Sequence, residues 1–417
     1  MSSTHPSIRP ARIVGFCLAI TLFELLTYMA SDMIMPAMLT VVHDFNADAR
    51  HVPNAFNLYL IGGVCLQWLI GPLSDRLGRR PMLLFGCLLF GTACAAAFLS
   101  QTIEAFNALR LIQGMGLGFV IAVSYPALQE VFCEADAVRL MALLGNVALL
   151  SPLLAPLIGS LLLEWFNWRQ LFLGLGLSAA VAWLGLFFCM PETLATRRLD
   201  GTRLALVPFA FTHTLQRYLA LLRNGKFVCA SLALGLMSLP LMAWIGLAPL
   251  LLIERQGLST VEYGLWQIPV FSAVIVGNLM LDRLLSLLTL PRLIRLALWP
   301  YCLGLLAVLA MAFTTDSLVV LVAALALYAV GLGMSNAALY RIALFSSDDS
   351  KGLVSAMVGM LSIAVMGAGG WLVATLGAGA NLQSFALWIA ISGLLCLPIL
   401  PRALRGNASP TSSSYHH

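Results

Sequence analysis

Long apolar runs alternate with short polar breaks along almost the whole chain. A helix crosses the hydrocarbon core of a bilayer with about 20 mostly apolar residues. Twelve runs come close to or exceed that length, at 13–42, 52–73, 81–100, 104–128, 138–163, 168–189, 226–253, 262–281, 292–313, 317–345, 352–375 and 383–401. The pattern therefore predicts an all-α integral membrane protein with twelve transmembrane helices.

One polar break, at 190–225, is much longer than the others and divides the runs into six and six. We expect two six-helix halves at 1–189 and 226–405, a linker between them, and a disordered tail at 406–417. Apolar residues in the linker predict a helix that lies along the membrane surface. They are Leu206, Phe209, Leu215, Tyr218, Leu219 and Leu222.

A faint internal repeat supports two pseudo-symmetric halves. Two short patterns of the first half recur in the second, Asp75-Arg76 as Asp282-Arg283 and Gly116-x-Gly118 as Gly331-x-Gly333. Parallel repeats of this kind are typical of membrane transporters whose two halves are related by an axis along the membrane normal.

Composition and charge exclude a soluble fold. Hydrophobic residues make up 60% of the chain and charged residues only 10%, whereas soluble domains carry about 25% charged residues. The net charge of +5 does not indicate nucleic-acid binding, because the basic residues follow membrane topology and do not cluster on a soluble face. Only Arg50, Arg169 and Arg255 lie in the odd-numbered connections. This asymmetry predicts an inner-membrane protein with both termini and the 190–225 linker in the cytoplasm.

Cofactor chemistry has no visible signature. The nine cysteines stand singly, without metal-site or disulfide spacing, and no Walker A sequence is present. We therefore expect no cofactor and no ATP-driven transport by this chain.

The strongest local motif is Gly-Pro-Leu-Ser-Asp-Arg-Leu-Gly-Arg-Arg-Pro at 71–81, where spans two and three meet. Glycines permit a tight turn and close helix approach. Asp75 can face a helix N-terminus and pair with a neighbouring arginine, so such contacts can hold the two halves in one conformation and break in another. The alternative is a loop that only obeys the positive-inside rule. The candidate residues are Gly71, Asp75, Arg76, Gly78, Arg79 and Arg80.

Two carboxyl groups, Glu24 and Asp32, occupy the first span. A central acidic residue costs roughly 2.5–3.5 kcal/mol on insertion scales, and intramembrane ionisable groups usually face a cavity and serve a pathway. Eight helical residues separate the acids by about 12 Å and about 80°, so they share a broad face that Tyr28 could also line. Burial disfavours a charged carboxylate, so proton uptake near neutral pH and attraction of a lipophilic cation can compete. A mainly structural role for Asp32 stays open.

Arg110 lies within the fourth span and needs a partner or a wet cavity. An acid of span one is one candidate partner, and backbone carbonyls are the alternative. Since arginine keeps its proton, its expected role is to tune a carboxyl group or to hold a polar network. Arg341, near the cytoplasmic end of span ten, could instead snorkel to the surface.

Span five carries Pro152, Pro156 and Gly159 among small residues, in Ser-Pro-Leu-Leu-Ala-Pro-Leu-Ile-Gly-Ser. Prolines bend a helix by removing backbone bonds. The segment resembles the antiporter signature of the major facilitator superfamily, although Ser151, Ala155 and Ser160 stand where that signature has glycine.

Taken together, these residues resemble the proton-coupled multidrug antiporters of the major facilitator superfamily. The likeness includes the 71–81 motif, Glu24 and Asp32, Leu109-Arg110 with Gln113-Gly114, and Ser238-Leu239-Pro240-Leu241 with Ala243-Trp244-Ile245. The resemblance implies a major facilitator fold that works as a monomer in membrane lipid, with Glu24, Asp32 and Arg110 coupling protons to the export of lipophilic cationic and neutral drugs. The expected cavity lining, besides the two acids, is Tyr28, Tyr125, Met141, Asn146, Leu149, Leu234, Leu239 and Trp266.

Two other functions stay open at this point. A proton-coupled solute symporter would need the same groups, because the direction of transport is weakly encoded. An integral membrane enzyme could use paired acids and an arginine, but no constellation of nucleophile, base and metal is visible in the chain. We therefore expect a transporter and no enzymatic activity.

Overall fold

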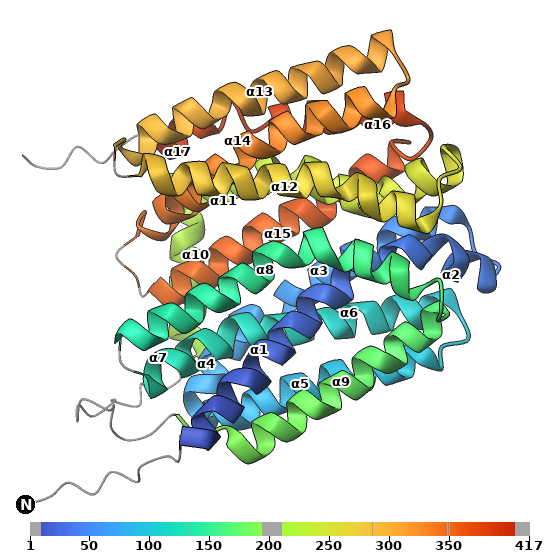
Figure 1. Ribbon diagram of the computed structural model, residues 1–417. Coiled ribbons are helices and arrows are strands. Elements are labelled where there is room, and N and C mark those ends of the chain that lie inside the picture. Colours follow the sequence, from blue (N-terminus) through green and yellow to red (C-terminus); the bar gives the residue numbers. More distant parts are fainter. Residues whose placement is uncertain are drawn as a thin grey trace, which may run out of the picture.

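The computed structural model describes residues 10–132, 134–193, 211–285, 287–347, 349 and 351–404. Every regular element among them is helical (Figure 1). The α-helices are α1 (Pro10–Asp32), α2 (Met38–Asp44), α3 (Val52–Cys65), α4 (Gln67–Leu77), α5 (Arg79–Phe98), α6 (Ile103–Phe119), α7 (Tyr125–Val131), α8 (Glu134–Leu162), α9 (Trp168–Cys189), α10 (Phe211–Arg223), α11 (Gly225–Ala248), α12 (Thr260–Leu284), α13 (Leu290–Thr314), α14 (Leu318–Leu344), α15 (Lys351–Thr375), α16 (Leu382–Leu394) and α17 (Leu400–Leu404). Short 3₁₀ segments are η1 (Met35–Ala37) and η2 (Ala49–His51), and π segments are η3 (Val120–Ser124) and η4 (Pro249–Arg255).

The helices confirm an all-α membrane protein. In the described part of the chain, nine helices are long and apolar enough to cross a bilayer, and a tenth span results if the bent pair Ala49–Cys65 and Gln67–Leu77 counts as one. Two shorter apolar helices, Leu150–Leu162 and Leu382–Leu394, lie where the other two spans are expected. The total agrees with the twelve spans predicted from the apolar runs.

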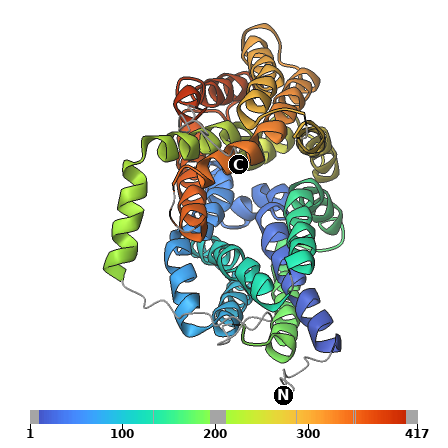
Figure 2. The same ribbon diagram turned by 90° about the vertical axis from the view of Figure 1, so that its left-hand side faces the viewer.

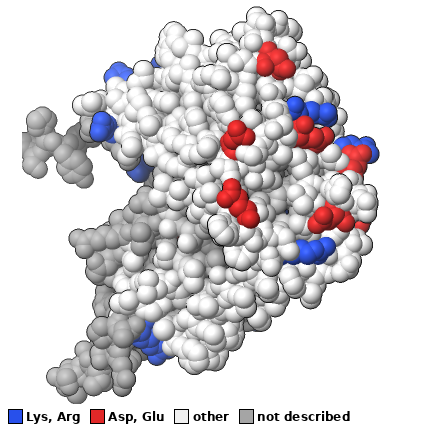
Figure 3. Space-filling model, turned by 45° about the vertical axis from the view of Figure 1, so that its right-hand side comes forward, with Lys and Arg blue, Asp and Glu red and all other residues white. Residues whose placement is uncertain are grey.

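The helices form two groups along the molecule. Helices α1 to α9 lie on one side and α11 to α17 on the other, and the start of α1 and the short α17 lie at the same end (Figure 1). Charged side chains gather toward the ends and leave a broad uncharged area between them (Figure 3). A boundary at 190–225 between two repeat-related halves stays a prediction.

Glycines let the helices of each group approach closely, and they do so in matching ways. A Cβ on Gly118 of α6 would lie 2.7 Å from the Gly63 carbonyl oxygen of α3, and one on Gly333 of α14 would lie 2.3 Å from the Val274 carbonyl oxygen of α12. Gly116 likewise packs on Phe90 of α5, as Gly331 packs on Tyr301 of α13. Span four therefore packs on spans two and three in the manner in which span ten packs on spans eight and nine.

Two predicted spans are broken. The expected span 52–73 is the bent pair α3 and α4, with a bend of 42° between its helices. The Trp68 indole N–H donates to the Cys65 carbonyl oxygen at 3.0 Å and thus takes up a backbone acceptor at the break. The expected span 383–401 is wrong beyond Leu394, where α16 ends and turns lead to α17. Pro398 has no backbone N–H and disfavours helix at the preceding residue, so the helix does not continue.

The linker helix is observed as α10, which lies along the flank of the end that holds α17 (Figure 2). Tyr218 and Leu221 are buried, whereas Leu215, Leu219 and Leu222 are exposed. Leu206 and Phe209, together with the tail at 406–417, lie outside the described residues. The position of α10 along a membrane surface stays a prediction.

A proline explains how α10 attaches to the first group. Pro72 within α4 cannot donate to the Trp68 carbonyl oxygen four residues earlier. The Tyr218 hydroxyl donates to that same oxygen at 3.3 Å. The linker helix therefore supplies a donor to a carbonyl oxygen to which Pro72 cannot donate.

Candidate functional site

Glu24 is fully buried on α1 and only half satisfied. Its Oε1 accepts a hydrogen bond from the Tyr125 hydroxyl at 3.1 Å, and its Oε2 has no partner among the described residues. Tyr125 begins α7, directly after the π segment η3, and Pro126 follows it. Single π turns inside α-helices are frequent at functional sites. Tyr28, one turn after Glu24, is half-buried.

Asp32 is the last residue of α1 and is 3% exposed. Its Oδ1 has no hydrogen-bond partner in the described part of the chain. The predicted span 13–42 corresponds to one apolar segment, Arg12–Asp44, within which α1 gives way to the 3₁₀ segment η1 with Pro36 in its first turn. Both carboxyl groups of span one are therefore buried, and each has one oxygen free.

Arg110 on α6 is fully buried and bonds mainly to backbone carbonyls. Its guanidinium donates to the oxygens of Ala30 (2.9 Å), Ser31 (3.2 Å) and Ala55 (3.2 Å), and to Oε1 of Gln113 (2.8 Å). The last four carbonyls of a helix lack partners within it, and a cation there also suits the negative end of the helix dipole. Arg110 thus caps the end of α1 and ties it to α3.

Of the two partners considered for Arg110, an acid of span one or backbone carbonyls, the structure shows the backbone carbonyls. No ion pair joins Arg110 to Glu24 or Asp32 in the ranges that the structure describes. The guanidinium also lies 4.6 Å from the centre of the Tyr59 ring, and the Tyr59 hydroxyl donates to the Thr27 carbonyl oxygen. Sequence reasoning missed Tyr59, because one tyrosine in an apolar span carries no signal of its neighbours.

Helix α12 brings further buried polar groups to this region. Tyr263 and Gln267 are 1% exposed, and α12 packs against η1, the segment that follows Asp32 in the chain. Neither amide atom of Gln267 has a partner among the described residues. These residues were missed as well, although their spacing of four places them on one face of a helix. Trp266, which was predicted, is half-buried beside Gln267.

The other predicted lining residues are more scattered. Leu234 and Leu239 are buried on α11, and Leu239 packs against Gly369 of α15. Met141 is half-buried, and its sulfur lies 3.4 Å from the Gln129 amide nitrogen. The side chains of Asn146 and Leu149 lie outside the described residues. Of the predicted set, Glu24 and Tyr125 are joined directly.

The 71–81 motif forms a network inside the first group of helices. Asp75 pairs with Arg79 at 2.5 Å, and Arg79 pairs with Glu130 of α7 at 3.0 Å. Arg79 also donates to the Ser74 hydroxyl, and the Thr193 hydroxyl donates to Glu130 Oε2 at 2.6 Å. The expected pairing of Asp75 with an arginine is therefore observed, but these contacts lie within the first group of helices, whereas they were expected to hold the two halves together.

The carboxylate at a helix N-terminus is Glu192, whereas Asp75 was expected there. Glu192 accepts the backbone N–H groups of Arg79 (2.9 Å) and Arg80 (3.3 Å) at the start of α5. An anion is favourable at this end of a helix. Arg80 donates to the Phe187 carbonyl oxygen at 2.6 Å and so adds a second link to α9. Glu192 lies far away in sequence, which is why sequence reasoning did not find it.

The motif is less of a loop than expected. Residues up to Leu77 belong to α4, which includes Arg76 in its last turn, and α5 begins at Arg79. Gly78 has φ +106° and makes the whole turn, which a residue with a Cβ would adopt only with strain. Gly71 lies within α4, and a Cβ there would meet nothing within 4 Å, so no close helix approach occurs at Gly71.

Span five is one continuous helix, α8, despite its two prolines. Pro152 and Pro156 lie inside it, and the Ser160 hydroxyl donates to the Pro156 carbonyl oxygen at 2.7 Å. A Cβ on Gly159 would lie 2.1 Å from the Met33 carbonyl oxygen, directly beyond the end of α1. Gly159 therefore permits close contact between α8 and the region of Asp32.

Arg341 is exposed in the last turn of α14, and its guanidinium lies 5.2 Å from the Phe345 ring centre. This position fits the expected side chain that snorkels to the surface.

Comparison with known proteins extends over almost the whole chain. A family model described as Major Facilitator Superfamily matches residues 20–362. The multidrug transporter MdfA of Edwardsiella ictaluri (strain 93-146) is 43% identical over 412 residues, which are 97% of each chain. The protein of the same name from Yersinia pestis bv. Antiqua (strain Angola) is 42% identical over 400 residues, 94% of this chain and 96% of the relative. Among solved structures, a D-xylose-proton symporter superposes with a TM-score of 0.74 at 16% identity, covering 93% of this chain and 97% of that one.

Proposed function

The chain belongs to the major facilitator superfamily, and from that membership we propose that it exports several drugs in exchange for protons. The two curated relatives named above are multidrug transporters, and each aligns over at least 94% of this chain. In the proposed cycle the groups α1 to α9 and α11 to α17 rock against each other around a central site, as the halves of such transporters do.

The observation that carries the proposal is the state of the two carboxyl groups of α1. Glu24 and Asp32 are buried, and each has an oxygen without a hydrogen-bond partner in the described part of the chain. Arg110 donates to backbone carbonyls, and no ion pair joins it to either acid among the described residues. A carboxyl group in this state can hold a proton or attract a lipophilic cation, but not both at once.

The remaining predicted residues have supporting roles in this proposal. Tyr28, Tyr125, Met141, Asn146, Leu149, Leu234, Leu239 and Trp266 supply surface to a drug. The network of Asp75, Arg79 and Glu130 changes between conformations, and Pro152, Pro156 and Gly159 shape α8 beside α1. Monomers act in the bacterial inner membrane, with both termini in the cytoplasm.

Transport in liposomes tests the proposal. Purified protein is reconstituted, the membrane potential is clamped, and uptake of radiolabelled tetraphenylphosphonium is followed under pH gradients of either sign. An acidic interior should drive accumulation, because protons leave as the cation enters. Accumulation driven by an alkaline interior would indicate symport. Recovery of a chemically altered compound would indicate an enzyme.

A further inference from the structure

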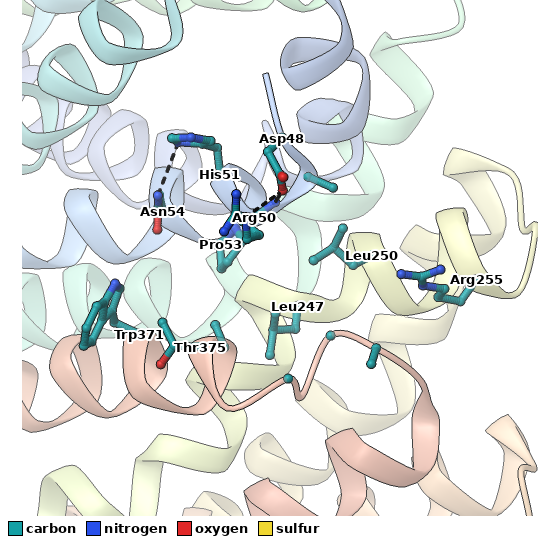
Figure 4. Close-up of a pocket in the computed structure, with 15 residues that line it drawn as sticks. Asp48, Arg50, His51, Pro53, Asn54, Leu247, Leu250, Arg255, Trp371 and Thr375 are labelled. Atoms are coloured by element: carbon teal, nitrogen blue, oxygen red, sulfur yellow. Dashed lines mark hydrogen bonds and ion pairs between the residues drawn. The ribbon is translucent and has the colours of Figure 1, made fainter. Parts of the chain in front are cut away.

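A pocket of about 660 Å³ is lined in part by η2. This segment follows α2 at the end of the molecule opposite to α17, here called the outer end (Figure 1). The walls of the pocket come from both helix groups (Figure 4). Arg50 and its neighbours in η2 and α3 form one wall, Leu247, Leu250 and Arg255 of α11 and η4 form a second, and Trp371 of α15 forms a third.

The charges of this pocket are mainly positive. Arg50 and Arg255 lie on walls from different groups, and Asp48 is the one acid among the lining residues. Asp48 accepts the backbone N–H of Arg50 at 2.8 Å and pairs with its Nε at 3.0 Å. The hydrogen bond from the Arg50 backbone N–H lowers the pKa of Asp48 most, and the hydrogen bond from the Arg50 side chain lowers it further. The Asp48 carboxylate therefore stays ionised and is already paired with Arg50. Arg255 has no ion pair with a carboxylate in the described ranges, which leaves a positive charge for an anion.

Apart from its charged residues the pocket has a mixed lining, in which His51, Asn54 and Thr375 are polar. Leu247 and Leu250 line it, and Trp371 is 57% exposed near the outer end of α15. Tryptophan is enriched at the membrane–water interface, where its ring sits at the level of the lipid headgroups. The pocket thus combines two arginines with apolar surface, and the exposed ring of Trp371 suits a position at the membrane interface.

We propose that this outer pocket binds an anionic phospholipid, with its phosphate between Arg50 and Arg255 and an acyl chain beside Trp371. Arginine suits phosphate because its planar fork donates two parallel hydrogen bonds. The exported lipophilic cations do not fit this pocket, because both arginines repel them. The inference goes beyond the transport function and does not depend on proton coupling.

A lipid in this position has a conformational consequence. Its phosphate would contact both helix groups, so it binds best when their outer ends lie together, as they do here. A ligand shifts an equilibrium toward the state that it binds more tightly. Anionic lipid would therefore favour the conformation in which the outer ends are closed.

Native mass spectrometry of the full-length protein in detergent tests the proposal. Phosphatidylglycerol is titrated into wild type, Arg50→Gln/Arg255→Gln and the control Arg292→Gln/Arg295→Gln, which removes two exposed cations at the start of α13. We expect one tightly held phosphatidylglycerol on wild type and on the control. The affinity for phosphatidylglycerol should fall about 100-fold in Arg50→Gln/Arg255→Gln, because each of the two lost hydrogen-bonded charges contributes about tenfold.

Two further arms decide between ligand sources. Glycerol 3-phosphate offers the phosphate without acyl chains, and phosphatidylethanolamine offers the chains without net charge. Weak binding of both supports an anionic lipid site, whereas glycerol 3-phosphate binding as tightly as phosphatidylglycerol would overturn the role of the lipid. Equal phosphatidylglycerol binding by wild type and Arg50→Gln/Arg255→Gln would overturn the site itself. Retained tetraphenylphosphonium binding shows that each variant is folded.

Discussion

Replacing Glu24 by glutamine should separate cationic from neutral substrates. Glutamine keeps the size of the side chain, and its carbonyl oxygen can still accept the hydrogen bond that the Tyr125 hydroxyl donates at 3.1 Å. The substitution therefore removes a charge from a buried site and leaves the local packing intact. Tyr125→Phe is the matched control, because it removes the hydrogen bond and keeps the carboxyl group.

The expected magnitude follows from Coulomb's law. A monovalent cation about 6 Å from the carboxylate, at an effective dielectric constant of about 20, gains about 3 kcal/mol. Losing that interaction weakens cation binding by about 100-fold. An uncharged drug loses no Coulomb partner, and its exchange can continue through the second acid, Asp32.

Paired uptake into inverted membrane vesicles measures this difference. One lipophilic cation and one uncharged drug are compared at matched expression of wild type, Glu24→Gln and Tyr125→Phe. We expect Glu24→Gln to abolish cation uptake and to retain most uptake of the uncharged drug. Equal loss of both activities would refute the reasoning, because Glu24 would then be an obligatory proton carrier.

Three other substitutions have expected outcomes. Asp75→Asn removes the ion pair with Arg79 at one end of α4, so transport should fall while equilibrium binding of tetraphenylphosphonium is kept. Equal losses of transport and of binding would contradict a conformational role for Asp75. Gly114→Ala would place a Cβ 2.0 Å from the Tyr59 carbonyl oxygen, so folded protein should be lost in detergent gel filtration, whereas Gly71→Ala, which meets nothing within 4 Å, should elute as wild type. Arg110→Lys cannot keep all four hydrogen bonds of the guanidinium, so the free energy of unfolding should fall by about 2 kcal/mol or more. Thermal unfolding in detergent measures this loss, and an unchanged melting temperature would contradict the role of Arg110 as a cap for α1.

The spans could be predicted because a bilayer requires long apolar segments whatever their neighbours are. The run 168–189, for example, coincides with α9. The breaks were harder to predict, because only some have a local cause. Pro36 and Pro398 interrupt helices, whereas the bend after Cys65 has no proline or glycine at the break.

The partners of the site residues could not be predicted in the same way. Helices that are apolar on all sides show little periodicity, so the sequence does not reveal how each is rotated. The contact of Arg110 with the end of α1, the capping of α5 by Glu192, and the position of Gln267 all depend on that rotation. Asp75 was accordingly placed at a helix N-terminus that Glu192 occupies.

Proton release on substrate binding tests the central claim most directly. Purified protein in weakly buffered detergent at neutral pH is mixed with saturating tetraphenylphosphonium, and a pH-sensitive dye reports released protons. Our account predicts release by wild type and none by Glu24→Gln/Asp32→Asn. Tight cation binding to wild type without any proton release would contradict competition of proton and substrate for the carboxyl groups of α1.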